Sequence, residues 1–266
     1  MDIHTFIVVS NTLVERMEVL NPIEVYGISY QYVGTKDLAV KDITFHVKSN
    51  EIVGLLGHNG SGKTTIMNCI AGLFQPVQGK VLLSGTQISD LCKPKPVGYV
   101  PADPILYNML TVQEYIVFIG KLHHLSTAQI HTISEPLLDM LKLKDNRHKL
   151  IKHLSHGMKQ KVSMITGLLH QPPALVLDEP MTGFDAQSTK EMKDFLVHLV
   201  RTNHGAGILL SSHRLDIVES ICDRIVVIRQ GQLIFTGSVQ ELKHSAQHGN
   251  SLEEAFLSIT SENGGN

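Results

Sequence analysis

Hydrophobic positions along the chain change their spacing several times, and each change predicts an element of secondary structure. Short apolar runs between turn residues predict strands at residues 23–30, 43–47 and 51–57. Later runs of the same kind predict strands at residues 80–84, 97–101, 174–178, 207–212 and 224–228. Because these runs alternate with helical segments, the chain has the pattern of a mixed α/β core.

Helical spacing marks the segments between the strands. Ile66, Ile70 and Leu73 recur on one helical face directly after the strand at residues 51–57. Between about residues 103 and 170 the pattern is mainly helical. We therefore expect a helical lobe inserted between strands of the core.

Residues 1–22 are interpreted as an N-terminal extension. Apolar positions from Ile3 to Leu20 fall at approximate helical spacing, and Asn21–Pro22 closes the segment. One hypothesis is that translation begins at Met17, which would leave a short leader before the first strand. Mass spectrometry of the native N-terminus tests this hypothesis, and peptides that precede Met17 would exclude it.

Composition narrows the class of protein. Of 266 residues, 42% are hydrophobic and 18% are charged, so the chain can bury a core and is not disordered. A net charge of −2 and a pI of about 6.7 offer no bulk attraction to nucleic acid, which we do not expect as a partner. Cys69, Cys92 and Cys222 lie far apart, which suits free thiols in a reducing compartment. No apolar run approaches the ~18 residues of a membrane helix, so we expect a soluble chain that reaches a membrane through a partner.

The stretch GHNGSGKTT at residues 57–65 fits the phosphate-binding pattern G-x-x-x-x-G-K-[ST] between a strand and a helix. Its glycines allow a tight turn whose N–H groups point at phosphate oxygens, and the helix that follows adds the positive end of its dipole. Lys63 supplies a charge for the β- and γ-phosphates, and the Thr64 hydroxyl can bind Mg²⁺. The residues predicted to bind the phosphates are Gly57, His58, Asn59, Gly60, Ser61, Gly62, Lys63, Thr64 and Thr65.

Two carboxylates follow the buried run ALVL at residues 174–177. Beside a phosphate loop, Asp178 would hold Mg²⁺ and Glu179 could polarise an attacking water. A capping or turn role for the Asp-Glu-Pro sequence is the alternative when the stretch is considered alone.

The stretch LSHGM at residues 154–158 places Ser155 beside His156. A nucleophile and its base would have to face each other, but adjacent helical residues point about 100° apart. No G-x-S-x-G turn surrounds the serine either. Two interpretations stay open for Ser155 on these grounds: a helix cap or a ligand of another group.

These stretches together resemble the ATP-binding subunit of an ATP-binding cassette (ABC) transporter, over about residues 23–258. A GTPase would need an N-K-x-D base reader after the phosphate loop, and the chain has none there. The resemblance implies a P-loop NTPase fold, with a RecA-like α/β core, an antiparallel β-subdomain and an inserted helical subdomain. It places the ATPase domain at residues 23–245, its helical subdomain at about 103–170, and a C-terminal helix and tail at 246–266.

The resemblance also implies roles for single residues. LSHGM is similar to the family's signature loop, so Ser155 and Gly157 would bind the γ-phosphate held by the other subunit. MTGFDA at residues 181–186 is similar to the loop that touches that subunit, with Asp185 at the contact position. His213 would position Glu179 and the attacking water.

An aromatic side chain before the phosphate loop completes the expected nucleotide site. Tyr32 occupies the place where the family stacks a ring on adenine, although Tyr26 and Tyr30 lie close by in the sequence.

Several positions depart from the family's pattern. Ala102 stands where a glutamine completes the Mg²⁺ and water shell, so we expect slower hydrolysis with ATP binding retained. Asp103 follows it and could approach the metal or simply form an Asp-Pro turn. His156 replaces a signature glycine, where it either adds a pH-dependent contact or only occupies space. Asn50 replaces a frequent glycine, and asparagine tolerates the positive φ of such a turn.

Two further features indicate which branch of the family the chain resembles. Met158 in the signature loop, and SLEEAFLSIT at residues 251–260, resemble the branch that exports drugs, polysaccharides and peptides. Lys161 keeps the charge of a common arginine without its planar fork.

The function implied is an ATP-binding and hydrolysing subunit, with ATP and Mg²⁺ as cofactors, that drives a separate membrane permease, with export as the expected direction. It would form a head-to-tail homodimer, or pair with a paralogous subunit, and lie in the cytoplasm on the inner face of the cell membrane. The alternative is an ATP-gated assembly or regulatory protein with little turnover. The observation in its favour is that residue 102 is alanine and not glutamine.

Overall fold

The computed structural model of the protein describes residues 20–88, 96–202, 206–245 and 251–261. The segment with helical spacing at residues 1–19 lies outside the described residues, together with Met17 and Cys92. No helix in the described ranges is long and apolar enough to cross a membrane.

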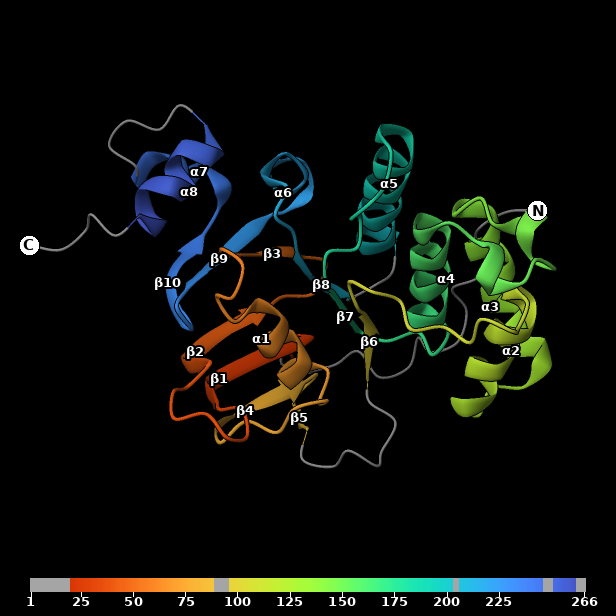
Figure 1. Ribbon diagram of the computed structural model, residues 1–266, viewed down its shortest axis with the longest axis horizontal. Helices are drawn as coiled ribbons and strands as arrows, with labels where there is room; N and C mark the ends of the chain where they lie inside the picture. Colours follow the sequence, from red (N-terminus) through yellow and green to blue (C-terminus); the bar gives the residue numbers. More distant parts are fainter. Residues whose placement is uncertain (1–19, 89–95, 203–205, 246–250, 262–266) are drawn as a thin grey trace, which may run out of the picture.

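The described strands form two sheets (Figure 1). A four-stranded antiparallel sheet has the order β2-β1-β4-β5, and a six-stranded sheet has the order β10-β9-β3-β8-β7-β6. In the larger sheet only β10 runs antiparallel to its neighbour. The strands are β1 Ile23–Tyr30, β2 Val40–Val47, β3 Ile52–Leu56, β4 Gln78–Leu83, β5 Thr86–Gln87, β6 Val97–Val100, β7 Ala174–Leu177, β8 Gly207–Ser211, β9 Arg224–Arg229 and β10 Gln232–Gly237.

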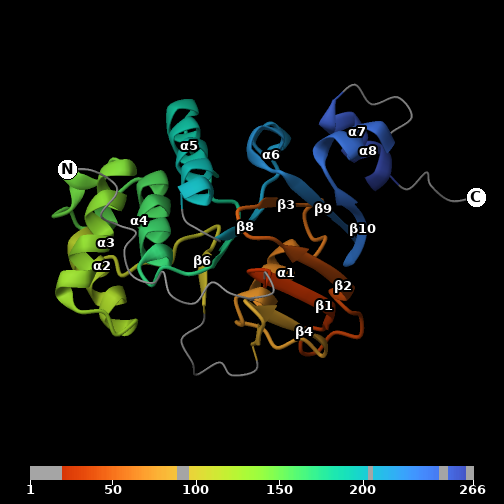
Figure 2. The same cartoon turned by 180° about the vertical axis from the view of Figure 1, so that it is seen from behind.

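Helices cover the larger sheet and form a separate lobe beside it (Figures 1 and 2). The lobe of α2, α3 and α4 lies between β6 and β7 in the sequence, as expected from the helical pattern there. The helices are α1 Lys63–Ile70, α2 Val112–Leu122, α3 Thr127–Met140, α4 His156–Leu168, α5 Ala186–Thr202, α6 Leu215–Ile221, α7 Val239–Ser245 and α8 Leu252–Thr260.

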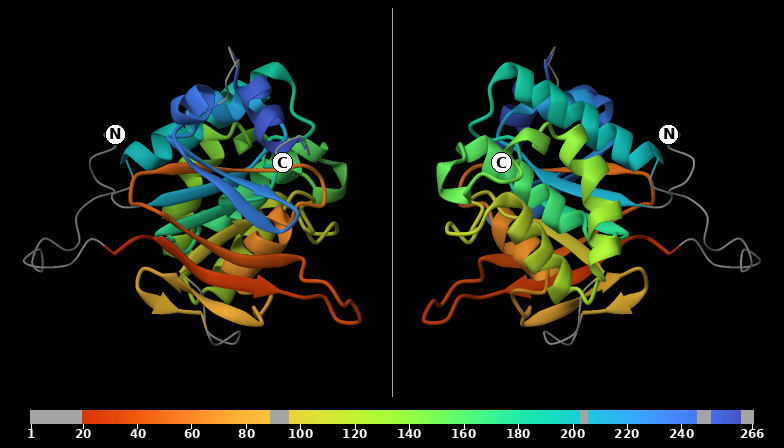
Figure 3. Two further views of the ribbon diagram at one scale, coloured as in Figure 1. Left: turned by 90° about the vertical axis from the view of Figure 1, so that its left-hand side faces the viewer. Right: turned by 90° about the vertical axis from the view of Figure 1, so that its right-hand side faces the viewer.

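Burial explains why the sequences of the central strands are continuous apolar runs. Every residue of β3, β7 and β8 is buried, because helices or the second sheet cover both faces of the parallel sheet. Figure 3 shows these layers from the side: the antiparallel sheet, the parallel sheet and then helices α5 to α8.

Buried apolar side chains form three clusters among the residues that the structure describes. One joins the parallel sheet to α2, α3, α4 and α5, and a second joins the antiparallel sheet and α1 to the other face. The third joins β9 and β10 to α6, α7 and α8. The C-terminal helix is therefore part of the core packing and not an appendage.

Most predicted elements coincide with observed ones, but Leu73 is an exception. Ile66 and Ile70 are fully buried on α1, whereas Leu73 lies beyond its end and is 58% exposed. The helix ends early because Gly72 adopts a left-handed conformation at φ 64°. The positive φ expected of Asn50 is observed, at 58°.

Two strands have no counterpart in the predicted pattern. β5 has only two residues, and β10 is exposed or half-buried along its length, so neither shows a buried apolar run. The fold class that the sequence predicted, a P-loop core with an antiparallel sheet and a helical insertion, is nonetheless the one observed.

Candidate functional site

The carboxyl ends of three neighbouring parallel strands create the site. β3 pairs with β8, and β8 pairs with β7, so the loops that follow these strands meet at one edge of the sheet. Ligands of open α/β sheets bind at such an edge. The loop at residues 57–62 follows β3, Asp178 and Glu179 follow β7, and His213 follows β8.

The turn between β3 and α1 requires its glycines. A Cβ atom at Gly57 would lie 2.4 Å from the carbonyl oxygen of Ile228, so no larger residue fits there. Gly62 caps α1 at φ 106° and Gly60 adopts φ 77°, conformations that L side chains rarely adopt. The glycines thus allow a tight turn at the N-terminus of α1, where backbone N–H groups can bind an anion.

Lys63 lies at the start of α1 and is folded back over its own loop. Its ammonium group donates to the carbonyl oxygens of Gly57 at 2.7 Å and His58 at 3.1 Å. Burial lowers the pKa of Lys63, and the nearby carboxylates of Glu179 and Asp178 oppose that shift. The lysine is therefore a cation at the mouth of the turn, held by neutral oxygens that an anion can replace.

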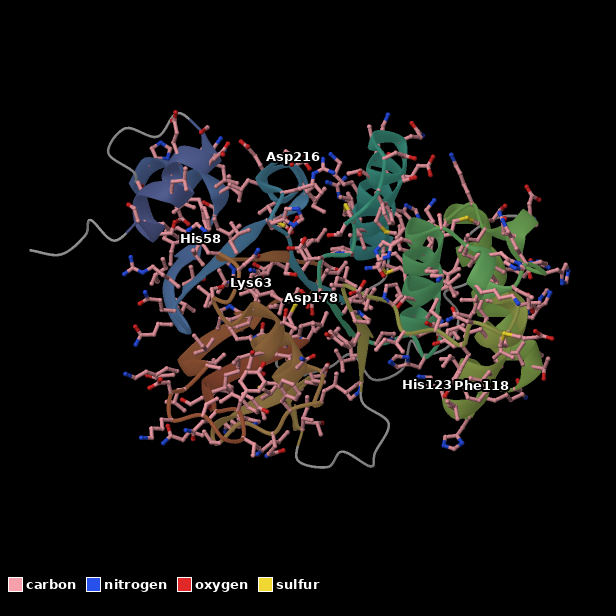
Figure 4. The ribbon with its side chains drawn as sticks, viewed as in Figure 1. His58, Lys63, Phe118, His123, Asp178 and Asp216 are labelled. Atoms are coloured by element: carbon pink, nitrogen blue, oxygen red, sulfur yellow. The ribbon has the colours of Figure 1, made fainter. Side chains whose placement is uncertain are left out.

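Asp178 is buried and receives two hydroxyl groups. Thr64 Oγ1 donates to its Oδ2 at 2.9 Å, and Ser211 Oγ donates to its Oδ1 at 2.6 Å. Thr64 comes from α1 and Ser211 from β8, so the carboxylate joins both neighbouring elements. Figure 4 labels Asp178 and Lys63 in this region.

Glu179 and His213 form a hydrogen-bonded pair beside Asp178. His213 Nδ1 lies 2.8 Å from Glu179 Oε2, and the backbone N–H of Glu179 donates to Ser211 Oγ at 2.9 Å. Because a carboxylate only accepts, His213 donates from Nδ1 and keeps Nε2 for another partner. Glu179 has a φ of 48°, a strained conformation of the kind found at functional sites.

The donor set at this edge fits a magnesium–nucleotide complex. Mg²⁺ prefers oxygen ligands, and the Thr64 hydroxyl and the Asp178 carboxylate already lie 2.9 Å apart. The turn ahead of α1 and the Lys63 ammonium supply the complementary groups for phosphates. No group of three or more His, Cys, Asp or Glu side chains within the described ranges could hold a metal without such added ligands.

Tyr32 lies beside the first turn of α1. Its hydroxyl is 2.8 Å from Thr65 Oγ1, and the residue is 41% exposed. Tyr30 instead stacks on Phe74 with centroids 4.9 Å apart, and Tyr26 bonds to Glu24. Of the three candidate tyrosines, Tyr32 is the one bonded to the helix of the phosphate loop.

A second group of candidate residues consists of Ser155, Gly157 and Asp185. Among the described residues, no hydrogen bond joins this group to the phosphate loop. The Ser155 hydroxyl caps α4 by accepting from the N–H of Met158 at 3.3 Å. A Cβ atom at Gly157 would touch the Phe184 ring at 3.3 Å, so the two loops are packed together. Figures 1 and 2 place α4 and α1 on either side of β6.

Asp185 directly precedes α5 and belongs to the same second group. Its carboxylate accepts from the N–H of Ser188 at 2.6 Å, and this hydrogen bond lowers the pKa of Asp185. His156 is exposed and packs on the neighbouring loop, since a Cβ atom at Gly183 would lie 3.3 Å from its ring. One chain thus presents its phosphate loop and its signature loop as separate surfaces.

A cavity of about 490 Å³ opens beside the phosphate loop. It is bounded by side chains from the loop, from the segment after β8 and from the C-terminal helix. The lining residues are Leu56, Gly57, His58, Asn59, Ser212, His213, Leu215 and Phe256.

Ala102 lies at the start of the segment that leads from β6 to α2. Its methyl group offers no ligand, but its carbonyl accepts from Gln160 Nε2 at 3.1 Å, as does the carbonyl of Pro101. Gln160 is only 1% exposed and belongs to α4. Helix α4 therefore binds the backbone of the segment that contains Pro101 and Ala102. Asp103 is exposed.

Ser211 and Gln160 are site residues that the sequence motifs did not single out. No sequence signal pointed to Ser211, because its place near Asp178 follows from the register of two parallel strands, in which Leu177 and Leu210 are partners. Gln160 had no sequence signal either, since its partner segment lies far away in the sequence.

Comparisons with known proteins agree with this geometry. Residues 40–182 match the protein family described as ABC transporter. The ATP-binding protein NatA of an ABC transporter from Bacillus subtilis is 31% identical over 223 residues, which cover 83% of this chain and 89% of NatA. YxlF, another such protein of Bacillus subtilis, is 37% identical over 79% of this chain and 69% of its own length. The mouse organic anion transporter ABCA8A is 36% identical over 78% of this chain, but the chain spans only 13% of that protein.

Solved structures show the same architecture. An ATP-binding subunit of an ABC transporter superposes with a TM-score of 0.81 at 31% identity, covering 90% of this chain and 99% of that one. A dimeric ATP-binding cassette in a post-hydrolysis state, bound to ADP and phosphate, has a TM-score of 0.74 at 21% identity. It covers 81% of this chain and 98% of its own, and at that identity the likeness concerns the fold alone.

Proposed function

Because the chain belongs to the ABC transporter family, we propose that it binds and hydrolyses ATP as the nucleotide-binding subunit of a transporter. The observation that carries the proposal is the hydrogen-bonded series from Thr64 through Asp178 and Ser211 to Glu179 and His213. This series joins two hydroxyls and two carboxylates to a histidine at the mouth of a phosphate loop. A purely structural Asp-Glu-Pro turn would not require it.

Each residue of the candidate site has a distinct part in the proposed hydrolysis. Lys63 and the N–H groups of the turn hold the β- and γ-phosphates, and Tyr32 supplies a ring for the adenine. Thr64 and Asp178 would hold Mg²⁺, which neutralises charge on the phosphates when it is bound.

Glu179 accepts a proton from the attacking water, and His213 orients that carboxylate through Nδ1. Because the Glu179 backbone is also fixed by Ser211, the base has little freedom to turn away from the site.

A second copy of the chain, or a paralogue, completes the site. Ser155 and Gly157 lie on a surface separate from the phosphate loop, so they would serve the nucleotide of the opposing subunit. The hydroxyl of Ser155 and the N–H groups at the start of α4 are suited to a γ-phosphate. Asp185 would meet the opposing subunit beside them. Binding at the γ-phosphate then favours the closed pair, and hydrolysis removes that preference.

An exposed apolar surface is our candidate for the contact with a membrane permease. Ile105, Tyr107 and Met109 are 92%, 60% and 71% exposed, and the Tyr107 ring meets Phe118 of α2 at 5.4 Å. Figure 4 labels Phe118 on the outer side of the helical lobe. Apolar side chains gathered in this way mark interaction surfaces. Because Gln160 holds the adjoining segment, movement of the permease could reach the signature loop through α4.

The direction of transport and the location are parts of the same proposal. Met158 and the helix α8 resemble the exporting branch, so we propose export, with the subunit on the inner face of the cell membrane. A neighbouring gene that encodes several apolar spans of ~20 residues would support the permease partner.

The ATPase rate of the purified chain, measured against Glu179→Gln, tests the proposal. We expect the substitution to lower the rate by about 100-fold or more, since it removes the base, while ATP binding persists. Equal rates in the two proteins would contradict the proposed hydrolysis. They would favour the second candidate, an ATP-gated regulatory protein, for which the missing glutamine at Ala102 is the specific observation.

A further inference from the structure

The side chain of His58 connects the phosphate loop to the C-terminal helix. Its Nε2 lies 3.0 Å from Thr260 Oγ1, and its ring lies 5.2 Å from the ring of Phe256, centroid to centroid. Thr260 and Phe256 are only 5% and 8% exposed, whereas His58 itself is exposed. In the view of Figure 4, His58 lies between Lys63 and the C-terminal helix.

The direction of the hydrogen bond follows from the second contact of Thr260. Its hydroxyl donates its single hydrogen to the carbonyl oxygen of Phe256 at 2.7 Å, within the helix. The same oxygen must therefore accept from His58, which carries its hydrogen on Nε2. This arrangement gives the imidazole one orientation, because the ring cannot rotate without losing the bond.

The helix α8 that provides these contacts is itself firmly packed. Leu252, Ala255 and Phe256 belong to one buried cluster with Leu56, the last residue of β3, and Val218 of α6. β3 leads into the phosphate loop, and α6 follows His213. The helix thus rests on elements that flank both sides of the candidate site. Phe256 and His213 also line the same 490 Å³ cavity.

The backbone of His58 reaches Lys63, the lysine at the phosphate loop. Its carbonyl oxygen accepts from Lys63 Nζ at 3.1 Å, next to the bond from the same ammonium group to Gly57 at 2.7 Å. Any shift of His58 would move one of the two oxygens that place this ammonium group. Contacts therefore run without a break from Thr260 through His58 to Lys63.

We propose that Thr260 and Phe256 are positioning residues for the phosphate loop, which act through His58 and set the affinity of the chain for ATP. The helix that ends at Thr260 is thereby a part of the nucleotide site, although it lies outside the motifs of that site. The proposal rests on the ATP binding inferred above. Anything that moved α8 would alter nucleotide affinity through the same contacts.

Equilibrium binding of the fluorescent analogue mant-ATP with Mg²⁺ tests the proposal. Thr260→Val keeps the shape of the side chain but removes the hydroxyl, and we expect the dissociation constant to rise about two- to tenfold, as for one lost hydrogen bond. Thr260→Ser keeps the hydroxyl and should restore the wild-type value. Leu257→Ala is the matched control, because Leu257 belongs to the same helix and is 49% exposed. This variant should leave the dissociation constant unchanged.

A second pair of variants separates positioning from a general loss of stability. In a His58→Ala background, Thr260→Val should not weaken binding further, because the route through the imidazole is already gone. Equal weakening in both backgrounds, or unchanged binding in Thr260→Val alone, would overturn the proposal. His58→Gln serves as the background if the alanine variant does not fold. Absence of mant-ATP binding by the wild-type chain would instead refute the proposed function itself.

Discussion

At the scale of single residues, Ser211 governs how the two carboxylates differ. Its completely buried hydroxyl donates to Asp178 and accepts from the N–H of Glu179. The Asp178 carboxylate is thereby hydrogen-bonded to Thr64 and Ser211, while the Glu179 carboxylate is hydrogen-bonded to His213. One hydroxyl thus separates the carboxylate that we propose as a metal ligand from the one that we propose as the base.

We expect Ala102 to slow hydrolysis, since it lacks the amide that would complete the Mg²⁺ and water shell. We predict that Ala102→Gln raises the steady-state ATPase rate several-fold with little change in ATP binding. The backbone should tolerate the change, because Gln160 holds the carbonyls of Pro101 and Ala102 and not their side chains.

Asp103→Asn provides the control for this prediction. If Asp103 only forms an Asp-Pro turn, the variant should keep the wild-type rate, since asparagine supports the same turn. If it stands in for the missing amide, the variant should be slower. An unchanged rate in Ala102→Gln would show that the position does not limit hydrolysis.

At the scale of elements, Glu191 joins the helical lobe to the core. This residue of α5 accepts from Lys142 at 2.6 Å, at the end of α3, and lies 3.5 Å from Lys161 on α4. The hydrogen bond from Lys142, followed by one from Gln187, lowers the pKa of Glu191 to about 2. The charge at Lys161, where the family has an arginine, is thus used to bind α4 to α5.

This carboxylate predicts a pH dependence of stability. The pKa of Glu191 falls from its ordinary 4.5 to about 2 on folding, so its contribution is complete above about pH 5 and lost as the pH falls toward 2. The group is partly exposed, so solvent screening limits the contribution to about 1 kcal/mol. Glu191→Gln should lower the free energy of unfolding in urea by this amount at pH 7, and by progressively less at pH 4 and 3.

The exposed Glu253 of α8 offers a matched control for that measurement. Glu253→Gln makes the same chemical change without the two lysines, so its unfolding curve should differ little from the wild type at any of these pH values. A Glu191→Gln difference that did not shrink in acid would contradict the ion-pair explanation.

At the scale of the whole molecule, our proposal gives the chain two half-sites, neither of which it can close alone. The phosphate loop and the pair of Ser155 and Gly157 lie on separate surfaces, and one solved cassette of the same fold is a dimer. A head-to-tail pair would bring the two surfaces of different copies together around each nucleotide.

We predict that ATP drives this pairing. In a Glu179→Gln background, which slows hydrolysis, Mg²⁺–ATP should shift the chain from monomer to dimer in analytical ultracentrifugation. Adding Ser155→Ala should abolish the shift, because the hydroxyl for the opposing γ-phosphate is gone.

Ser126→Ala controls for the cap that Ser155→Ala also removes. Ser126 caps α3 as Ser155 caps α4, and loss of either should cost about 1 kcal/mol of stability. Only the Ser155 variant should lose the dimer. If both variants dimerise equally well, Ser155 is a cap and nothing more.

The sequence by itself determined the parts of this protein that depend on local pattern. Buried strands such as β3 and β7 appear as apolar runs, and the turn at residues 57–62 requires glycines, so both could be found without coordinates. The side chains at the strand ends then pointed to phosphate and metal chemistry. β10 was missed because it has no buried face, and Leu73 was misplaced because Gly72 ends α1 one turn earlier.

Only the tertiary structure decided which side chains meet across the fold. The bond of Ser211 to Asp178 depends on the alignment of two parallel strands, and Gln160 reaches Ala102 across the boundary between lobe and core. The contact of His58 with Thr260 joins the phosphate loop to the C-terminal helix. Sequence periodicity reports which face of an element is buried, but not which element covers it, so these partners follow from packing alone.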